Sequence, residues 1–169
     1  IESYGNLSVS KENIPSELKA LKRWVVWKYV LKPGAEKPTK PPYNAVTDGL
    51  AKPNSPATWS TFEVACKALE TGKYQGLGFM LGFEKSTGKN YFGVDLDGLV
   101  TPEKWKWATE IIKSLDSYTE ISPSGKGVHV LGIGTKGPDQ TGTNCRKLGV
   151  EVYDKTHYFT ATGNHFEGS

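Results

Sequence analysis

The sequence has few cysteines, few histidines and no long apolar run. Its two cysteines, Cys66 and Cys145, are too few for a disulfide scaffold. The three histidines, His129, His157 and His165, do not combine with them in a zinc-binding spacing, so no zinc is expected. No segment resembles a membrane span or a signal peptide. We therefore expect a soluble, cytoplasmic protein without a membrane partner.

The charge balance is mildly basic. The 169 residues carry a formal net charge of +3, which permits a nucleic-acid or phosphate partner without requiring one. A chain of this length forms one domain with a full core, or one domain with two lobes. Because it begins at Ile1 rather than at methionine, we expect it to be part of a longer protein, and by itself a monomer.

Hydrophobic periodicity predicts a mixture of helices and strands. Helices are expected at 17–22, with Ser16 as N-cap, at 58–71 and at 101–115. The third helix has an apolar stripe made of Trp105, Ala108, Ile112 and Leu115. Strands are expected at 23–31, 76–83, within 91–100, and at 117–121, 127–133, 149–153 and 157–162, with an extended loop at 32–57. This mixture predicts an α/β or α+β fold with helices packed against a sheet.

Two aspartates interrupt the apolar strand YFGVDLDGLV. Asp95 and Asp97 are two residues apart, so a strand places them on the face opposite Phe92, Val94 and Leu96. Buried, unpaired carboxylates are costly, and two neighbouring ones also repel each other. One or two divalent ions would compensate for both effects, and carboxylate oxygens favour Mg²⁺ or Mn²⁺. The alternative is a solvated strand face, and D-x-D also occurs by chance.

Two later strands repeat this small pattern. In GVHV and GVEVY, as in GVDL, a Gly-Val pair precedes a polar residue: His129, Glu151 and Asp95 respectively. Each glycine lies two positions upstream on the polar face, where strand glycines often admit a ligand or another backbone. If the strands are neighbours, their polar face forms a groove with a glycine floor. Glu151 would then add a third carboxylate to a metal site.

The segment SPSGKGVHV predicts a tight turn that leads into a strand. Glycine amides at Gly125 and Gly127 can approach an anion, Lys126 supplies positive charge, and His129 begins the strand floor. This arrangement suits a triphosphate. The spacing is not that of a Walker A loop, and a strand rather than a helix follows. Taken alone, the segment also fits an ordinary hairpin turn with a solvated lysine.

Three motifs in this order resemble those of archaeo-eukaryotic primases. They are D-h-D at Asp95 and Asp97, S-G-K-G-h-H at 124–129, and h-E-h-Y-D followed by Y-F-T-h-T-G within 150–163. More narrowly, they resemble the bifunctional primase-polymerase (prim-pol) domains of plasmids, phages and mobile elements. The stretches WVVW, KPTKPPYN, PATW and GLGF in the first half of the chain agree with this resemblance.

The resemblance implies a fold and an activity. The expected fold has an RNA-recognition-motif-like catalytic sheet at about 76–169 and an N-terminal α/β lobe at about 1–75. The expected activity is DNA primase and DNA polymerase: template-directed nucleotidyl transfer onto a primer 3′-hydroxyl. The partners would be DNA template and primer, a nucleoside or deoxynucleoside triphosphate, and a C-terminal helical or helicase domain of the full-length protein.

The resemblance also implies roles for particular residues. Asp95, Asp97 and Glu151 would hold two Mg²⁺ or Mn²⁺ ions and be catalytic. The nucleotide would be bound by residues of the second motif and the loop before the third, namely Ser124, Gly125, Lys126, Gly127, His129 and Arg146. Lys40, Tyr43 and His157 would contact template or nucleotide. Relatives often have an arginine at the position of His157, so this contact depends on pH here.

Two other functions fit parts of the pattern. A non-catalytic module could stack single-stranded nucleic acid on exposed aromatic rings, but the two aspartates would repel its phosphates unless a metal intervened. A metal-dependent replication-initiator nuclease needs a nucleophilic tyrosine and paired histidines around its metal. His129 alone lies on the expected floor, which argues against this second alternative.

Overall fold

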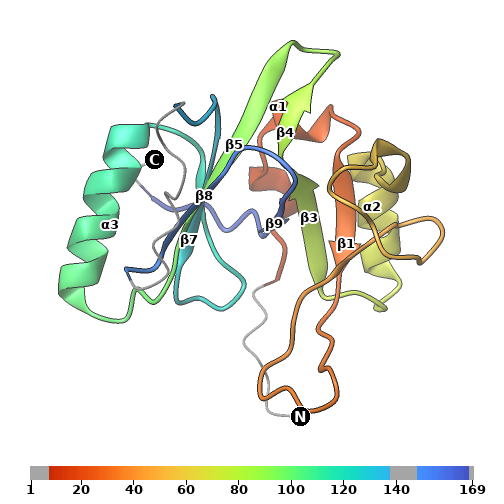
Figure 1. Cartoon of the computed structure of the whole chain (residues 1–169), viewed down its shortest axis with the longest axis horizontal. Coiled ribbons are helices and arrows are strands. Elements are labelled where there is room, and N and C mark those ends of the chain that lie inside the picture. Colours follow the sequence, from red (N-terminus) through yellow and green to blue (C-terminus); the bar gives the residue numbers. More distant parts are fainter. Residues whose placement is uncertain (1–7, 138–147, 168–169) are drawn as a thin grey trace.

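Two antiparallel sheets lie next to each other, with helices on their outer sides (Figure 1). The computed structural model describes residues 8–137 and 148–167. The expected mixed composition is confirmed, and because both sheets are antiparallel the fold is of the α+β type. No helix in the described part of the chain is long and apolar enough to cross a membrane.

The first sheet has the strand order β2-β1-β3-β9. Its strands are β1 (Trp24–Trp27), β2 (Pro42–Tyr43), β3 (Gly76–Met80) and β9 (Tyr158–Ala161). The same part of the chain also contains the helices α1 (Ser16–Lys19) and α2 (Phe62–Glu70) and two short 3-10 helices, η1 (Lys11–Asn13) and η2 (Pro56–Thr58). Trp24, Leu77 and Phe79 are fully buried in the core of this part, which also includes Leu18 of α1 and Ala65 of α2.

The second sheet has the order β4-β5-β7-β6, and β8 also pairs with β5. Its strands are β4 (Gly82–Glu84), β5 (Lys89–Leu96), β6 (Thr119–Ile121), β7 (Val128–Ile133) and β8 (Val150–Tyr153). Helix α3 (Pro102–Leu115) covers one face. The core between them contains Val94, Leu96, Val128 and Val130, with Ala108 and Ile112 of the helix.

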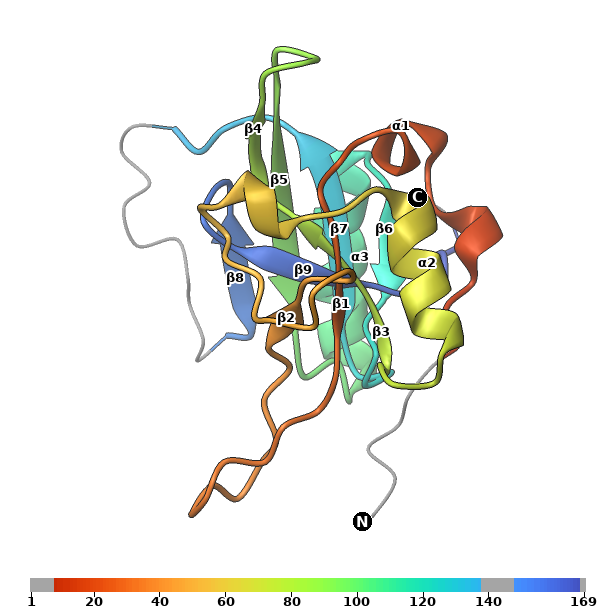
Figure 2. The same cartoon turned by 90° about the vertical axis from the view of Figure 1, so that its right-hand side faces the viewer.

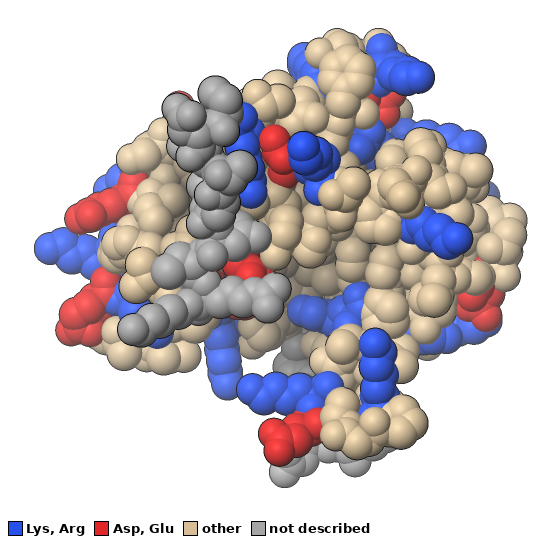
Figure 3. Space-filling model, viewed as in Figure 1, with Lys and Arg blue, Asp and Glu red and all other residues tan. Residues whose placement is uncertain are grey.

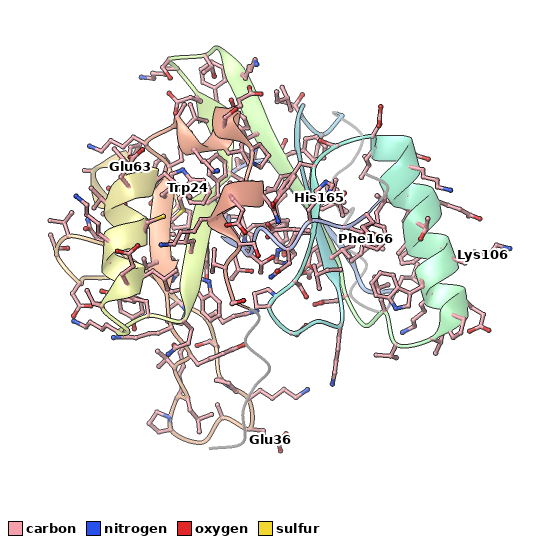
Figure 4. The ribbon with its side chains drawn as sticks, turned by 180° about the vertical axis from the view of Figure 1, so that it is seen from behind. Trp24, Glu36, Glu63, Lys106, His165 and Phe166 are labelled. Carbon is pink, nitrogen blue, oxygen red and sulfur yellow. The ribbon has the colours of Figure 1, made fainter. Side chains whose placement is uncertain are left out.

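Helix α3 matches the helix predicted at 101–115, except that Thr101 is its N-cap and the helix begins at Pro102. The Thr101 side chain caps its N-terminus by accepting a hydrogen bond from the Lys104 amide, and Pro102 occupies the first turn, where no amide partner is needed. Asp116 ends it in the left-handed conformation. Trp105 on its inner side stacks on Phe166, which lies beside this helix in Figure 4. The segment that follows β9 is thereby attached to the second core.

Several boundaries differ from the prediction. The helix expected at 58–71 begins at Phe62, because Thr61 provides the cap. Helix α1 is only four residues long and begins at Ser16, which is therefore its first residue and not its N-cap. The expected loop at 32–57 contains the short strand β2 and a protruding arm closed by paired backbone hydrogen bonds between Val30 and Thr39 (Figure 2).

The strand expected at 76–83 is divided between the two sheets. Gly82 has a φ of +119°, a conformation that only glycine adopts readily, and the chain turns there from β3 into β4. In addition, β9 pairs with β3. A division of the chain near residue 75 therefore does not separate the two sheets, because the first sheet draws strands from both sides of it.

Candidate active site

The polar residues of the three repeated patterns lie directly opposite one another. Asp95 of β5 is the cross-strand partner of His129 on β7 and of Glu151 on β8. Side chains of directly opposed residues project from the same face, about 5 Å apart at Cβ. The intervening valines, such as Val94 and Val130, pack toward α3. The prediction that these three residues share one face is confirmed.

Asp97 lies just beyond this group. Strand β5 ends at Leu96, and Asp97 is exposed, with its amide donating a 2.8 Å hydrogen bond to the Gly149 carbonyl. A Cβ atom on Gly127 would lie only 2.8 Å from the Asp97 Oδ1 atom. The Asp97 carboxylate therefore borders the turn that precedes β7.

That turn is the predicted S-G-K-G segment. The Ser122 amide donates to the Gly127 carbonyl at 2.9 Å, and the Ser122 and Ser124 hydroxyls lie 3.1 Å apart. Gly125 has a φ of +70°, which explains glycine at the tip. Ser124, Gly125 and Lys126 are exposed. A tight turn between two strands is confirmed, and its role in anion binding stays a prediction.

The strand glycines do not form an open floor. A Cβ atom on Gly93 would lie 2.4 Å from the Phe159 ring, and one on Gly149 would lie 2.4 Å from the Asp97 carbonyl. These glycines allow the protein's own side chains and backbone to come close, which is the other common reason for a glycine in a strand. The open space lies instead beside Asp95.

A pocket of about 320 Å³ opens at Asp95, between the two sheets. Its lining comes from the second sheet, from β9 and the residue before it, and from the base of the protruding arm: Asp95, His129, His157, Tyr158, Thr160 and Lys40. The Tyr158 hydroxyl donates a hydrogen bond to the Lys40 carbonyl and so ties the arm to β9. Basic side chains gather around the hollow beside the arm (Figure 3).

The Asp95 carboxylate is in an electrostatically unfavourable position. Its side chain is 21% exposed, and burial raises its pKa to about 6. The nearby charges of Asp97 and Glu151 contribute to this rise. Its Oδ1 atom is buried and has no hydrogen-bond partner in the described part of the chain, because the Nε2 atom of His129 is 3.7 Å away.

Two basic groups partly offset this negative charge. Burial lowers the pKa of Lys40, while Asp95 and Asp97 oppose that change. Burial alone would also favour the neutral form of His129, but the carboxylates of Glu120 and Asp95 hold its pKa above the ordinary value. The pocket therefore contains positive charge next to an unsatisfied carboxylate, which suits a substrate with several phosphates.

The donor set beside Asp95 fits a divalent cation. An unpaired buried carboxylate oxygen lies opposite a second acid, Glu151, and a hard ion would relieve the repulsion between them. Within residues 8–137 and 148–167, no three His, Cys, Asp or Glu side chains are grouped closely enough to hold an ion. Completion of the site by Asp97 therefore stays a prediction.

The other predicted contacts lie in different places. His157 lines the pocket and stacks on the Tyr153 ring at a centroid distance of 3.7 Å, and burial lowers its pKa. Tyr43 packs against the first core, with the Lys28 Nζ atom 4.6 Å from its ring centre. Arg146 lies outside the described residues.

Sequence reasoning missed one residue near the pocket, Glu120. It is the cross-strand partner of His129 on β6, and its side chain is fully buried. The sequence contained an indirect signal, because a tight turn at 122–127 makes 120 and 129 opposite members of a hairpin.

The pocket predicts an unusual dependence of stability on pH. The Asp95 pKa rises from an ordinary 3.8 to about 6 on folding, so between these values the folded state binds a proton that the unfolded state releases. The free energy of unfolding of the metal-free protein should therefore fall as pH rises through this range. Urea titrations across it should show a smaller fall in Asp95→Asn and in wild type with saturating Mn²⁺. Equal slopes in wild type and Asp95→Asn would contradict the assignment.

Comparison with known proteins identifies one informative relative. No protein-family model matches the chain. The chain is 35% identical over 160 residues to a protein named DNA primase-polymerase from Nitratiruptor phage NrS-1. The match covers 89% of this chain and 21% of the relative, so the chain spans about a fifth of that protein's length. The two proteins are thus similar over most of this chain.

Proposed function

We propose that this chain is the catalytic domain of a DNA primase-polymerase that extends a primer by template-directed nucleotidyl transfer. The observation that carries the proposal is the group of Asp95, Glu151 and His129 beside a partly basic pocket, in a chain similar to a phage DNA primase-polymerase. The fold would be that of archaeo-eukaryotic primases, with the second sheet as the catalytic one. The natural setting would be replication of a plasmid, phage or mobile element.

The reaction joins a nucleotide to a primer end. The primer 3′-hydroxyl attacks the α-phosphate, the new P–O bond forms, and pyrophosphate leaves. Asp95 and Glu151, with Asp97, would hold Mg²⁺ or Mn²⁺. Such ions lower the pKa of an attacking hydroxyl and stabilise charge on the entering and leaving oxygens. His129 and Lys126 would bind the triphosphate, since one lines the pocket and the other lies on the adjacent turn.

The DNA would lie along the side of the pocket that carries the arm. Lys40 lines the pocket at the base of the arm, and Lys32 and Lys37 are exposed farther out. Lysines at such positions neutralise phosphates without reading sequence. Glu36, near the arm tip in Figure 4, reduces the positive charge only in part. Further domains of the full-length protein would complete template handling and primer initiation.

One assay tests this function. The chain is incubated with a primed template, an unprimed template, Mg²⁺ or Mn²⁺, and deoxynucleotides or ribonucleotides separately. We expect incorporation on the primed template that depends on the divalent ion. DNA binding without incorporation under any of these conditions would favour the single-strand-binding alternative. Cleavage of DNA without added nucleotide would favour the nuclease.

Replacement of Lys126 by alanine should weaken nucleotide binding. Loss of one charge-assisted contact to phosphate corresponds to a rise of about tenfold in the nucleotide KM, with a smaller change in kcat. Lys106→Ala is the matched control, because Lys106 projects from the outer side of α3 (Figure 4). An unchanged nucleotide KM in Lys126→Ala would show that the turn does not contact the nucleotide.

A further inference from the structure

Four ionisable residues form one row across the second sheet. Glu120 on β6 opposes His129 on β7, His129 opposes Asp95 on β5, and Asp95 opposes Glu151 on β8. Directly opposed residues share a face, so the row crosses the sheet on the side of the pocket. The proposed function uses the last three members. Glu120 has no part in it.

Glu120 is a carboxylate with 0% exposure, and it is held by three hydrogen bonds. The Thr162 and Gly163 amides each donate to it at 2.9 Å, and so does the Tyr118 hydroxyl. Such donors compensate for the loss of water around a buried carboxylate. They also fix its position, because backbone amides that are part of the fold have little freedom to move.

The fixed carboxylate faces the back of the His129 ring. Its Oε1 atom lies 3.8 Å from the Nδ1 atom of His129, which is also 3.0 Å from the Thr160 carbonyl. The carbonyl can only accept, so Nδ1 carries the proton. On the other side of the ring, Nε2 lies 3.7 Å from Asp95 Oδ1, at the pocket. The Glu120 carboxylate and the Thr160 carbonyl, both near Nδ1, therefore orient the His129 ring so that Nε2 faces the pocket.

We infer that Glu120 is a positioning residue of the nucleotide site: it orients His129 so that Nε2 faces the pocket and a phosphate there. This inference rests on the proposed function and adds to it a residue outside the three motifs. Glu120 would not touch the substrate. Its effect would pass through His129, whose backbone sits directly opposite and whose ring it contacts.

A merely structural role makes a different prediction. If Glu120 only joined β6 to the segment after β9, its loss would lower stability and the amount of active protein, without changing the affinity of the folded fraction for nucleotide. A positioning role instead raises the nucleotide KM, leaves the primer-template KM unchanged, and disappears when His129 is absent. A comparison of Michaelis constants and a double-mutant cycle separate these cases.

The test uses Glu120→Gln, which keeps the size of the side chain and removes its charge. We expect the nucleotide KM in primer extension to rise about tenfold, with the primer-template KM unchanged. Glu70→Gln is the matched control, because Glu70 is exposed on α2 and pairs with Lys11 away from the pocket. It should behave as wild type.

The same substitution is then made in His129→Ala. We expect no further rise in nucleotide KM from Glu120→Gln in that background, because the two residues act as a unit. Tyr118→Phe is a milder second variant that removes only the hydroxyl donor of Glu120 and should raise the KM about threefold. It keeps the test decisive if Glu120→Gln does not fold.

The outcomes are distinct. Lack of extension by the wild-type chain would overturn the proposed function itself. Extension by wild type with an unchanged nucleotide KM in the folded Glu120→Gln variant, or in Tyr118→Phe if that variant alone folds, would overturn this inference and leave the function standing. An equal rise in nucleotide KM from Glu120→Gln in the wild-type and His129→Ala backgrounds would also overturn this inference.

Discussion

Replacement of Asp95 by asparagine is expected to abolish primer extension while the protein remains folded. Asparagine has nearly the same shape, but its neutral amide oxygen is a much weaker ligand for a divalent ion than a carboxylate oxygen is. Loss of a central catalytic ligand corresponds to a fall in kcat/KM of roughly a thousandfold or more. The measurement is single-nucleotide extension of a labelled primer in saturating Mn²⁺.

The folded state should not suffer from this change. The Asp95 side chain is partly buried, with a raised pKa and an unpaired buried oxygen, so removal of its charge should keep or increase stability at neutral pH. Asp116→Asn is the matched control, because Asp116 is exposed at the end of α3 and asparagine accepts its left-handed conformation. Extension at the wild-type rate by Asp95→Asn would remove the basis of the metal assignment.

Replacement of Gly93 by alanine should strongly destabilise the protein. The new Cβ atom would lie 2.4 Å from the Phe159 ring, at the contact between β5 and β9. Because the ring is buried, relief requires the two sheets to separate, at a cost of roughly 3 kcal/mol in the free energy of unfolding. Urea denaturation measures this loss. Activity should fall as well, since β9 also contacts His129.

Two comparisons make the Gly93 result specific. Gly49→Ala places its Cβ atom in ordinary contact, 3.5 Å from the Thr47 hydroxyl, and should leave stability nearly unchanged. Phe159→Leu combined with Gly93→Ala should recover part of the lost stability, because the smaller side chain makes room. A Gly93→Ala protein as stable as wild type would show that the sheets are not in close contact at this point.

The candidate site was predictable where local periodicity determines it. A strand alternates its faces, so the Gly-Val-polar patterns place Asp95, His129 and Glu151 opposite the apolar core once the three segments are strands. Their apolar neighbours Val94 and Val130 confirm that alternation in the second core. The expectation that the strands are adjacent came from the repeated pattern and the family resemblance, and the register of β5 with β7 and β8 agrees with it.

Long-range relations were not predictable from the same information. Nothing local in the segment 76–83 shows that β3 and β4 enter different sheets, because the change depends on one backbone angle at Gly82. The ring that covers Gly93 comes from Phe159, far along the chain. Glu120 was overlooked because its importance depends on amides after β9, which no pattern around residue 120 reveals.

The position of strand β9 near the end of the described chain determines when the pocket is completed during synthesis. Strand β9 lines the pocket and pairs with β3 from the first half of the chain, and the residues directly after it hold Glu120. A growing chain that already contains Asp95, His129 and Glu151 still lacks strand β9, which lines the pocket beside Asp95 and His129. The pocket and the contacts of Glu120 are therefore completed only after residues 158–163 have been made.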